Sequence, residues 1–227
     1  MLITGDLGVR EMSTIQLYKG DCLEVMDGLI AMGVNVDAVL TSPPYNRKRN
    51  DKYLNYDDRK NDYYDFLVNS LEKMFSLCKN HVFFNIQTNY YNKQDVYKLI
   101  GKYADKIQNI IIWEKSNPLP ASGFNITNSF EYILVFGDKP LKSNKTYTKN
   151  HITTAVNTES TTKIHKAVMK QEVSDWIIEN FTKNNQTILD PFMGLGTTGK
   201  SCKQLGRNFI GVEIDNEYFN IAKELLA

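Results

Sequence analysis

The stretch that decides the fold is Thr187–Gly199, which reads TILDPFMGLGTTG. It begins with an apolar run of the strand type and continues through three glycines into residues 200–205, which have helical spacing. Glycines let a backbone approach a ligand closely, and the first turn of a helix presents free N–H groups and the positive end of its dipole. The stretch therefore predicts a strand, a glycine turn and a helix arranged around a nucleotide-like ligand.

An acidic residue follows the glycine turn at an informative distance. Residues 208–212 form a second apolar run of the strand type, and Glu213 closes it about twenty positions after Gly194. An acid at about this distance beyond a glycine turn commonly binds ribose hydroxyls. Glu213 is therefore a candidate cofactor ligand.

The same glycine stretch also fits a second pattern. Residues Gly194 to Ser201 match the phosphate loop of nucleotide hydrolases, with Lys200 and Ser201 at its end. Such enzymes build most of their sheet after the loop, whereas the residues after Gly199 suffice for one strand and one helix. Asp190-Pro191-Phe192 also has no role in that pattern. A nucleotide hydrolase is therefore the less favoured alternative.

The stretch Thr41–Asn46, TSPPYN, follows an apolar run at residues 36–40. Pro43 and Pro44 fix φ, lack an N–H donor and restrict the residues before them, so the carbonyls point outward in one geometry. A fixed acceptor beside the exposed ring of Tyr45 suits a planar amine. Taken alone, this stretch is better explained as an ordinary proline turn at a strand end, and only a partner motif gives it a further meaning.

Three motifs together supply that decision. Ser42-Pro43-Pro44-Tyr45, the stretch Asp190–Thr198 and Gly211–Asp215 resemble the DNA amino-methyltransferases, in the order of their β group. The resemblance covers nearly the whole chain. It implies that the glycine motif binds S-adenosylmethionine and that the Pro-Pro-Tyr motif holds the target base. The sequence departs from the family at Leu195, where the family usually has serine.

The resemblance also implies roles for individual positions. The catalytic positions are Ser42, Pro43, Pro44 and Tyr45. The cofactor-binding positions are Asp21, Cys22, His165, Asp190, Pro191, Phe192, Gly194, Gly196, Thr197, Thr198 and Glu213. An ordinary turn aspartate explains Asp21 equally well, and core packing by Trp176 and Ile177 explains the helix after His165 equally well.

The implied reaction is methyl transfer from a sulfonium to the exocyclic amine of adenine or cytosine. Hydrogen bonds from the amine to Ser42 and to the Pro43 carbonyl would free its delocalised lone pair and align it. Tyr45 would stack on a base that has left the duplex. No cysteine follows a proline, so methylation at cytosine carbon 5 lacks its nucleophile. Ser42 favours N4 of cytosine over N6 of adenine as the target.

Two charged segments are candidates for DNA binding. A mobile charged loop explains the segment after Tyr45 equally well, whereas for residues 139–170 a solvated loop is the usual explanation and phosphate contact becomes the better one beside a base-binding motif. Residues 139–170 hold seven lysines and one acid in a chain whose net charge is +1. The candidate phosphate contacts are Arg47, Lys48, Arg49, Lys142, Lys145 and Lys149. A recognition segment of about residues 139–163 is short for reading a site alone, so we expect a homodimer or a companion subunit.

At 227 residues the chain is long enough for one α/β domain, which we place at residues 14–227 after an N-terminal tail, residues 1–13. Strand and helix alternate, which predicts a Rossmann-like, mostly parallel sheet with helices on both faces. The strand expected third in a methyltransferase sheet comes first here, as in a circular permutation. No membrane span or signal peptide is evident, so we expect a cytoplasmic protein. Three cysteines without metal spacing predict no metal site.

Three functions remain after these observations. The favoured one is a DNA amino-methyltransferase. The alternatives are a nucleotide hydrolase built on Gly194 to Ser201 and a non-catalytic cofactor-binding subunit of a larger assembly. The last alternative would require a broken catalytic motif, whereas Ser42, Pro43, Pro44 and Tyr45 are all present.

Overall fold

A computed structural model describes residues 13–46, 60–118, 127–155 and 169–227. The strands of the described chain are β1 (Ile15–Lys19), β2 (Val36–Thr41), β3 (Cys78–Ile86), β4 (Ile107–Lys115), β5 (Phe130–Gly137), β6 (His151–Thr154), β7 (Thr187–Asp190) and β8 (Asn208–Glu213). The helices are α1 (Cys22–Ala31), α2 (Tyr63–Leu77), α3 (Lys93–Lys102), α5 (Gln171–Phe181), α6 (Thr197–Leu205) and α7 (Asn216–Leu226).

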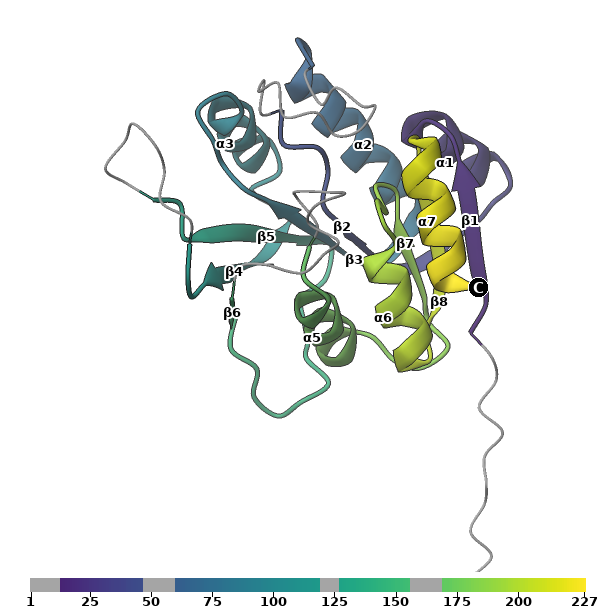
Figure 1. Ribbon diagram of the computed structural model, residues 1–227. Coiled ribbons are helices and arrows are strands. Elements are labelled where there is room, and N and C mark those ends of the chain that lie inside the picture. The colour runs from purple at the N-terminus through teal and green to yellow at the C-terminus, as the bar shows by residue number, and fades with distance from the viewer. Residues whose placement is uncertain (1–12, 47–59, 119–126, 156–168) are drawn as a thin grey trace, which may run out of the picture.

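The strands form one sheet in the order β1-β8-β7-β2-β3-β5-β4-β6. All neighbouring pairs are parallel except those of β5, which is antiparallel to β3 and β4. From β7 the next strand, β8, is added on one side, and from β2 the next strand, β3, is added on the other, so the order of the strands reverses between β7 and β2 (Figure 1). In open α/β sheets this reversal leaves a crevice beyond the carboxyl ends of the two strands, and ligands bind there.

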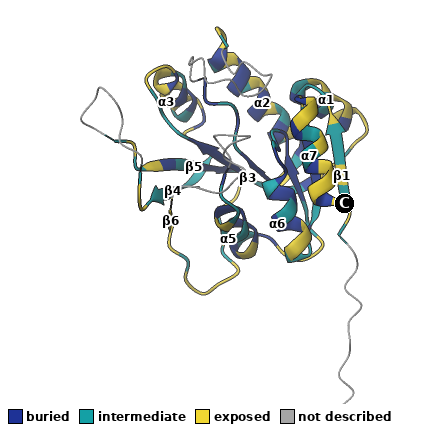
Figure 2. Cartoon of the chain, viewed as in Figure 1, coloured by how far each residue is buried: buried dark blue, intermediate teal, exposed yellow. Residues whose placement is uncertain are grey.

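Helices cover both faces of the sheet, as predicted. Buried residues of α1, α2 and α3 pack in one hydrophobic cluster, and those of α5, α6 and α7 pack in another on the opposite face. Figure 2 shows these helices with buried sides toward the sheet and exposed sides toward solvent. The predicted fold class, an α/β sheet that is mostly parallel and covered on both faces, is therefore confirmed.

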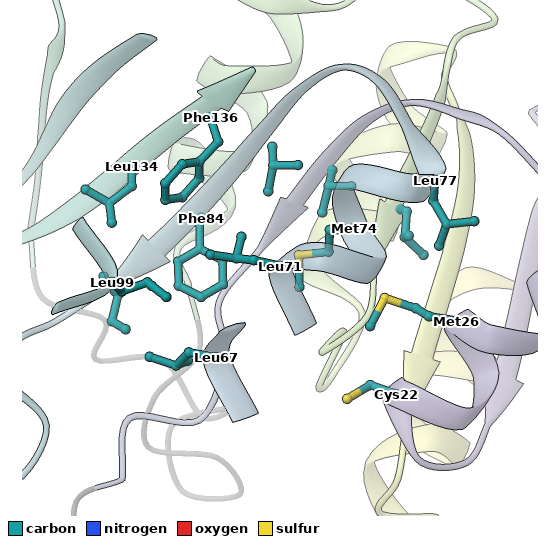
Figure 3. Close-up of a cluster of buried hydrophobic side chains, with 14 of the residues drawn as sticks. Cys22, Met26, Leu67, Leu71, Met74, Leu77, Phe84, Leu99, Leu134 and Phe136 are labelled. Atoms are coloured by element: carbon teal, nitrogen blue, oxygen red, sulfur yellow. The ribbon is translucent and has the colours of Figure 1, made fainter. Parts of the chain in front are cut away.

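The packing of α2 shows how the sequence pattern produces this layer. Leu67, Leu71 and Met74 recur at helical spacing, and all three are fully buried. Figure 3 shows them in the same cluster as Phe84 of β3 and Phe136 of β5. Burying a side chain of this size contributes about 1.5–3 kcal/mol, so this stripe holds α2 against the strands that carry the site.

The two ends of the described chain lie together in the sheet. The first strand, β1, pairs in parallel with the last, β8, with Ile15 opposite Phe209 and Lys19 opposite Glu213. A permuted methyltransferase order requires this neighbourhood, and the permutation itself stays a prediction. Of the predicted N-terminal tail, residues 1–12 lie outside the described residues.

None of the helices in the described ranges is both long enough and apolar enough to cross a membrane. The same ranges contain no cluster of three or more His, Cys, Asp or Glu side chains that could hold a metal ion.

Candidate active site

The site lies where β2 and β7 end side by side. Ala38 pairs with Ile188 and Val39 with Leu189, so the Thr41–Asn46 stretch and the glycine turn leave the sheet at the same edge. The Thr41 hydroxyl donates to Asp190 Oδ1 at 2.7 Å. The two motifs that the sequence analysis combined are therefore joined directly by a hydrogen bond.

Asp190 organises this junction from a buried position. Its Oδ2 accepts from the Thr198 hydroxyl at 2.7 Å, and its Oδ1 also accepts from the Phe192 N–H at 3.1 Å. Burial raises the pKa of Asp190 to about 6, while the hydrogen bonds from Thr41, Thr198 and Phe192 act to lower it. The carboxylate thus ties the end of β2, the glycine turn and α6 together.

The glycine turn contains two left-handed residues. Gly194 has φ +53° and Gly196 has φ +84°, a region that L-residues with a Cβ rarely occupy. A Cβ on Gly196 would lie 3.2 Å from the Cβ of Ala222, whereas a Cβ on Gly194 would meet nothing within 4 Å. Gly196 is therefore required by packing as well as by backbone conformation, and Gly194 borders open space.

Glu213 lies beside the glycine turn, as its spacing predicts. Its Oε2 accepts from the Gly194 N–H at 2.9 Å and its Oε1 from the Asp215 N–H at 2.8 Å. Burial is the main cause of the raised pKa of Glu213. The neighbouring strand end carries Asp21, whose Oδ1 accepts from the Leu23 and Glu24 N–H groups and so caps α1.

The Pro-Pro-Tyr segment is pinned by hydrogen bonds to its carbonyls. The Pro44 carbonyl accepts from the Tyr63 hydroxyl at 2.7 Å. The Tyr45 carbonyl accepts from the side chains of Asn89 at 2.8 Å and Asn92 at 2.9 Å. Among the described residues, no donor reaches the Pro43 carbonyl. Within the described ranges, this acceptor of the segment is therefore open to a ligand.

The ring of Tyr45 does not have the exposure that the sequence analysis expected. Tyr45 is only 5% exposed, so the expectation of an exposed ring is wrong. The physical reason is its hydroxyl, which lies 2.8 Å from Ser42 Oγ, from Asn85 Nδ2 and from Glu131 Oε2. These partners hold the phenol inside the protein, and Ser42 beside it is partly exposed.

Sequence reasoning missed three polar residues of this site: Asn85 of β3, Lys115 of β4 and Glu131 of β5. Glu131 is 4% exposed, and its Oε1 accepts a charge-assisted hydrogen bond from Lys115. The available signal was a polar residue at the end of an apolar strand, as with Asn85 after Val82-Phe83-Phe84. That signal has no meaning until the strand order is known.

Three other predicted cofactor residues, Cys22, Pro191 and Phe192, pack against the protein's own side chains or are buried. Cys22 begins α1 inside the apolar cluster, and burial raises the pKa of its thiol to about 12. Pro191 is buried, and the half-buried ring of Phe192 packs edge-on against Phe66, with ring centroids 5.7 Å apart. Leu195, the departure from the family pattern, is 5% exposed. Whether Cys22, Pro191 and Phe192 contact the cofactor stays a prediction.

Of the predicted DNA contacts, only the three lysines fall within the described residues. Arg47, Lys48 and Arg49 lie outside the described residues, as does the predicted cofactor residue His165. Lys142, Lys145 and Lys149 are exposed in the loop between β5 and β6. Asn144 in that loop donates to the Glu179 and Thr182 carbonyls at the end of α5, which is the edge opposite Ser42. The three lysines therefore do not line the site.

The chain is similar to known proteins. The family model described as DNA methylase matches residues 36–224. The chain is 25% identical over 245 residues to the type II methyltransferase M.HinfI of Haemophilus influenzae, covering 92% of this chain and 67% of that protein. It is 38% identical over 138 residues to M2.LlaDCHI of Lactococcus lactis subsp. cremoris, which covers 53% of this chain and about half, 51%, of that protein.

Among solved structures, the M1.HpyAVI–SAM complex superposes with a TM-score of 0.71 at 26% identity, covering 94% of this chain and 99% of that one. The family to which these proteins belong uses S-adenosylmethionine, the cofactor that the motifs predict. The match to the DNA methylase family covers most of the chain, including the two motifs that the bond between Thr41 and Asp190 joins. The resemblance found in the sequence is thereby confirmed, and the chain belongs to the DNA methylase family.

Proposed function

We propose that this protein transfers a methyl group from S-adenosylmethionine to the exocyclic amine of a base in DNA. The observation that carries the proposal is the bond between Thr41 and Asp190, because it places the Pro-Pro-Tyr segment against the glycine turn. A base held by the first motif and a cofactor held by the second would therefore meet at the reversal of the sheet.

The residues around the glycine turn fit the proposed cofactor. Gly194 borders open space, and the Glu213 carboxylate is fixed beside it. Each Glu213 oxygen accepts one backbone N–H, which leaves lone pairs able to accept ribose hydroxyls. Asp21 Oδ1 caps α1, and its Oδ2, which accepts no hydrogen bond from the described residues, would accept from an adenine amine. When bound, the cofactor supplies an electrophilic methyl group on a sulfonium.

The protein's own contribution at the target is orientation. Ser42 Oγ and the Pro43 carbonyl would accept the two amine hydrogens, which concentrates the lone pair on nitrogen and directs it. Pro43 is buried and Pro44 is held by Tyr63, so these acceptors do not need to reorganise during the reaction. The target base would have to leave the duplex, because its amine is unreachable inside the stack.

The target base is the finer part of the proposal. We propose N4 of cytosine over N6 of adenine, on the ground of Ser42 in the first motif. The test is to incubate purified protein with unmethylated DNA and labelled S-adenosylmethionine, digest the DNA and identify the nucleoside by mass spectrometry. N4-methylcytosine is the expected product; N6-methyladenine would overturn the choice of base and leave the methyltransferase proposal standing.

The nucleotide-hydrolase alternative has a physical objection in the structure. Ser201, which a phosphate loop would use on a metal ion, is fully buried in α6, and its hydroxyl has no partner within the described ranges. Thermal unfolding in the presence of S-adenosylmethionine and, separately, ATP distinguishes the two functions, because a ligand of the native state raises Tm. We expect S-adenosylmethionine alone to raise Tm, and a rise with ATP alone would contradict the proposal.

The proposal extends to the recognition of DNA. We propose that Arg47, Lys48 and Arg49 contact phosphates, and that a second copy or a companion subunit completes the recognition surface. Light scattering of the protein with and without a DNA duplex measures the stoichiometry directly. A complex of one protein chain on one duplex with full site specificity would remove the need for either partner.

A further inference from the structure

A largely buried polar cluster connects the Pro-Pro-Tyr segment to the neighbouring strands β3, β5 and β4. It consists of Ser42, Tyr45, Asn85, Lys115 and Glu131, and we call it the Glu131 cluster. Its members come from the end of β2, β3, β4 and the start of β5, because the antiparallel β5 begins where β3 ends. Four of its internal hydrogen bonds meet at the Tyr45 hydroxyl or at Glu131 Oε2.

The hydroxyl proton of Tyr45 has one destination in this cluster. A carboxylate paired with a lysine is an acceptor, so Tyr45 donates to Glu131 Oε2 at 2.8 Å. A phenol has a single proton, so the Tyr45 oxygen must act as acceptor toward Ser42 Oγ, also at 2.8 Å. Ser42 therefore donates to Tyr45, and the proton chain runs from Ser42 through Tyr45 to Glu131.

Asn85 reinforces the same direction. Its Nδ2 lies 2.8 Å from both the Tyr45 hydroxyl and Glu131 Oε2, and 3.3 Å from Ser42 Oγ. Turning the amide would place Oδ1 against the Glu131 carboxylate, acceptor against acceptor. With Nδ2 toward Tyr45 and Glu131, the Asn85 Oδ1 is buried and has no partner among the described residues. The two hydrogen bonds of 2.8 Å from Nδ2 offset this cost.

We propose that Glu131 is a positioning residue of the methyl transfer, which acts through Tyr45 to present Ser42 to the target amine as a hydrogen-bond acceptor. This inference rests on the proposed function. Because the Ser42 proton is directed at Tyr45 and Asn85 occupies at most one lone pair of Ser42 Oγ, the other lone pair is available to an amine hydrogen. If the hydrogen bonds ran in the opposite direction, Tyr45 would donate to Ser42. Ser42 would then donate its own proton to the amine and compete for the nitrogen lone pair that must attack the methyl group.

The discriminating variant is Glu131→Gln, which keeps the size of the side chain. Lys115 offers a charged donor and would hold the Gln carbonyl oxygen, since charge-assisted hydrogen bonds are the stronger ones. The Gln amide would then donate to Tyr45, and Tyr45 would donate to Ser42. We expect kcat to fall about 100-fold, with the KM for DNA and the Kd for S-adenosylmethionine within about twofold of the parent protein.

A second substitution should restore the direction of hydrogen-bond donation from Ser42 to Tyr45. In Glu131→Gln combined with Lys115→Met, the side chain of Asn85 would draw the Gln carbonyl oxygen toward Tyr45. We expect the double variant to regain at least about tenfold in kcat over the single variant. A merely structural role for Glu131 predicts the opposite, because the second change removes another buried partner.

The matched control is Glu72→Gln. Glu72 also accepts a tyrosine hydroxyl, from Tyr103 at 2.6 Å, on the α2 and α3 layer and without a contact to Ser42 or Tyr45. We expect it to leave kcat unchanged. Unfolding midpoints of all variants, followed by circular dichroism, show whether each one folds.

A readout without turnover keeps this inference separate from the proposed function. The C–O stretching band of a tyrosine differs between donating and accepting hydroxyls, and the Tyr45 band is isolated as the infrared difference between the parent protein and Tyr45→Phe. We expect Glu131→Gln to shift that band and the double variant to return it. An unshifted band, or unchanged kcat in Glu131→Gln, would overturn the inference; an inactive parent protein with a shifted band would overturn only the proposed function.

Discussion

The Thr41 hydroxyl donates to Asp190 at 2.7 Å across the reversal of the sheet, between residues 149 positions apart in the chain. We predict that Thr41→Val lowers the free energy of unfolding by about 1–3 kcal/mol, because it leaves a buried carboxylate with one donor fewer. Urea denaturation measures this. Thr187→Val on β7 is the control, since Thr187 does not contact Asp190, and an equal loss in both variants would contradict the importance of the bond.

The raised pKa of Asp190 gives a second prediction. Its pKa is about 6 in the folded protein and 3.8 for the free group, so the native state binds the proton more tightly. The contribution of Asp190 to the free energy of unfolding is therefore greatest below about pH 4 and is lost as the pH rises through 6. We predict that the unfolding free energy of the parent protein, relative to Asp190→Asn, falls by roughly 3 kcal/mol over this window. Denaturation at a series of pH values checks this, and a constant difference would refute it.

The two left-handed glycines should respond differently to alanine. Gly196→Ala adds a strained φ and a Cβ 3.2 Å from Ala222, so we predict a loss of at least about 2 kcal/mol in unfolding free energy. Gly194→Ala adds only the strain, about 1 kcal/mol. Thermal or urea unfolding of the pair ranks them, and the reverse order would show that packing at Ala222 is unimportant.

Glu213 should control the cofactor affinity. We predict that Glu213→Ala weakens S-adenosylmethionine binding about 10- to 100-fold, the loss expected for hydrogen bonds to a charged acceptor. Glu213→Gln should also weaken binding, because an amide can accept from only one of the Gly194 and Asp215 N–H groups. Isothermal titration calorimetry measures both, with the exposed Glu217→Gln as control. Binding unchanged in all three would rule out Glu213 as a ligand.

DNA binding provides a comparison between two basic segments. We predict that replacing Arg47 and Arg49 with alanine weakens binding and lowers the slope of log K against log salt by roughly one per lost phosphate contact. Replacing Lys142, Lys145 and Lys149 should change the slope less, because they lie at the opposite edge of the sheet from Ser42. Fluorescence anisotropy at several salt concentrations measures the slopes. A larger change of slope in the lysine variant would contradict the prediction and indicate that DNA binds at the edge of the sheet that carries the lysines.

Much of this protein is decided locally and can be predicted from the sequence. Apolar runs and glycines specify strand, turn and helix over residues 187–205. The distance to Glu213 predicts a ligand of ribose hydroxyls, and the structure holds its carboxylate at Gly194, within the glycine turn. Pro43 and Pro44 restrict their own backbone in any context. Three such motifs in order were sufficient to predict the α/β fold and the family.

Contacts between distant strands could be decided only by the tertiary structure. The antiparallel insertion of β5 brings Glu131 to Tyr45 over 86 positions, and the parallel pairing of β2 with β3 brings Asn85 to Tyr45 over 40. Tyr45 was expected to be exposed and is buried, because its hydroxyl forms hydrogen bonds with residues that no local sequence pattern indicates. Likewise, a basic run predicts a surface charge, whereas the anchoring of Asn144 to α5 determines at which edge Lys145 lies. Local sequence specifies backbone geometry through short-range sterics, whereas the partners of a buried polar group depend on sheet order, which is a property of the whole chain.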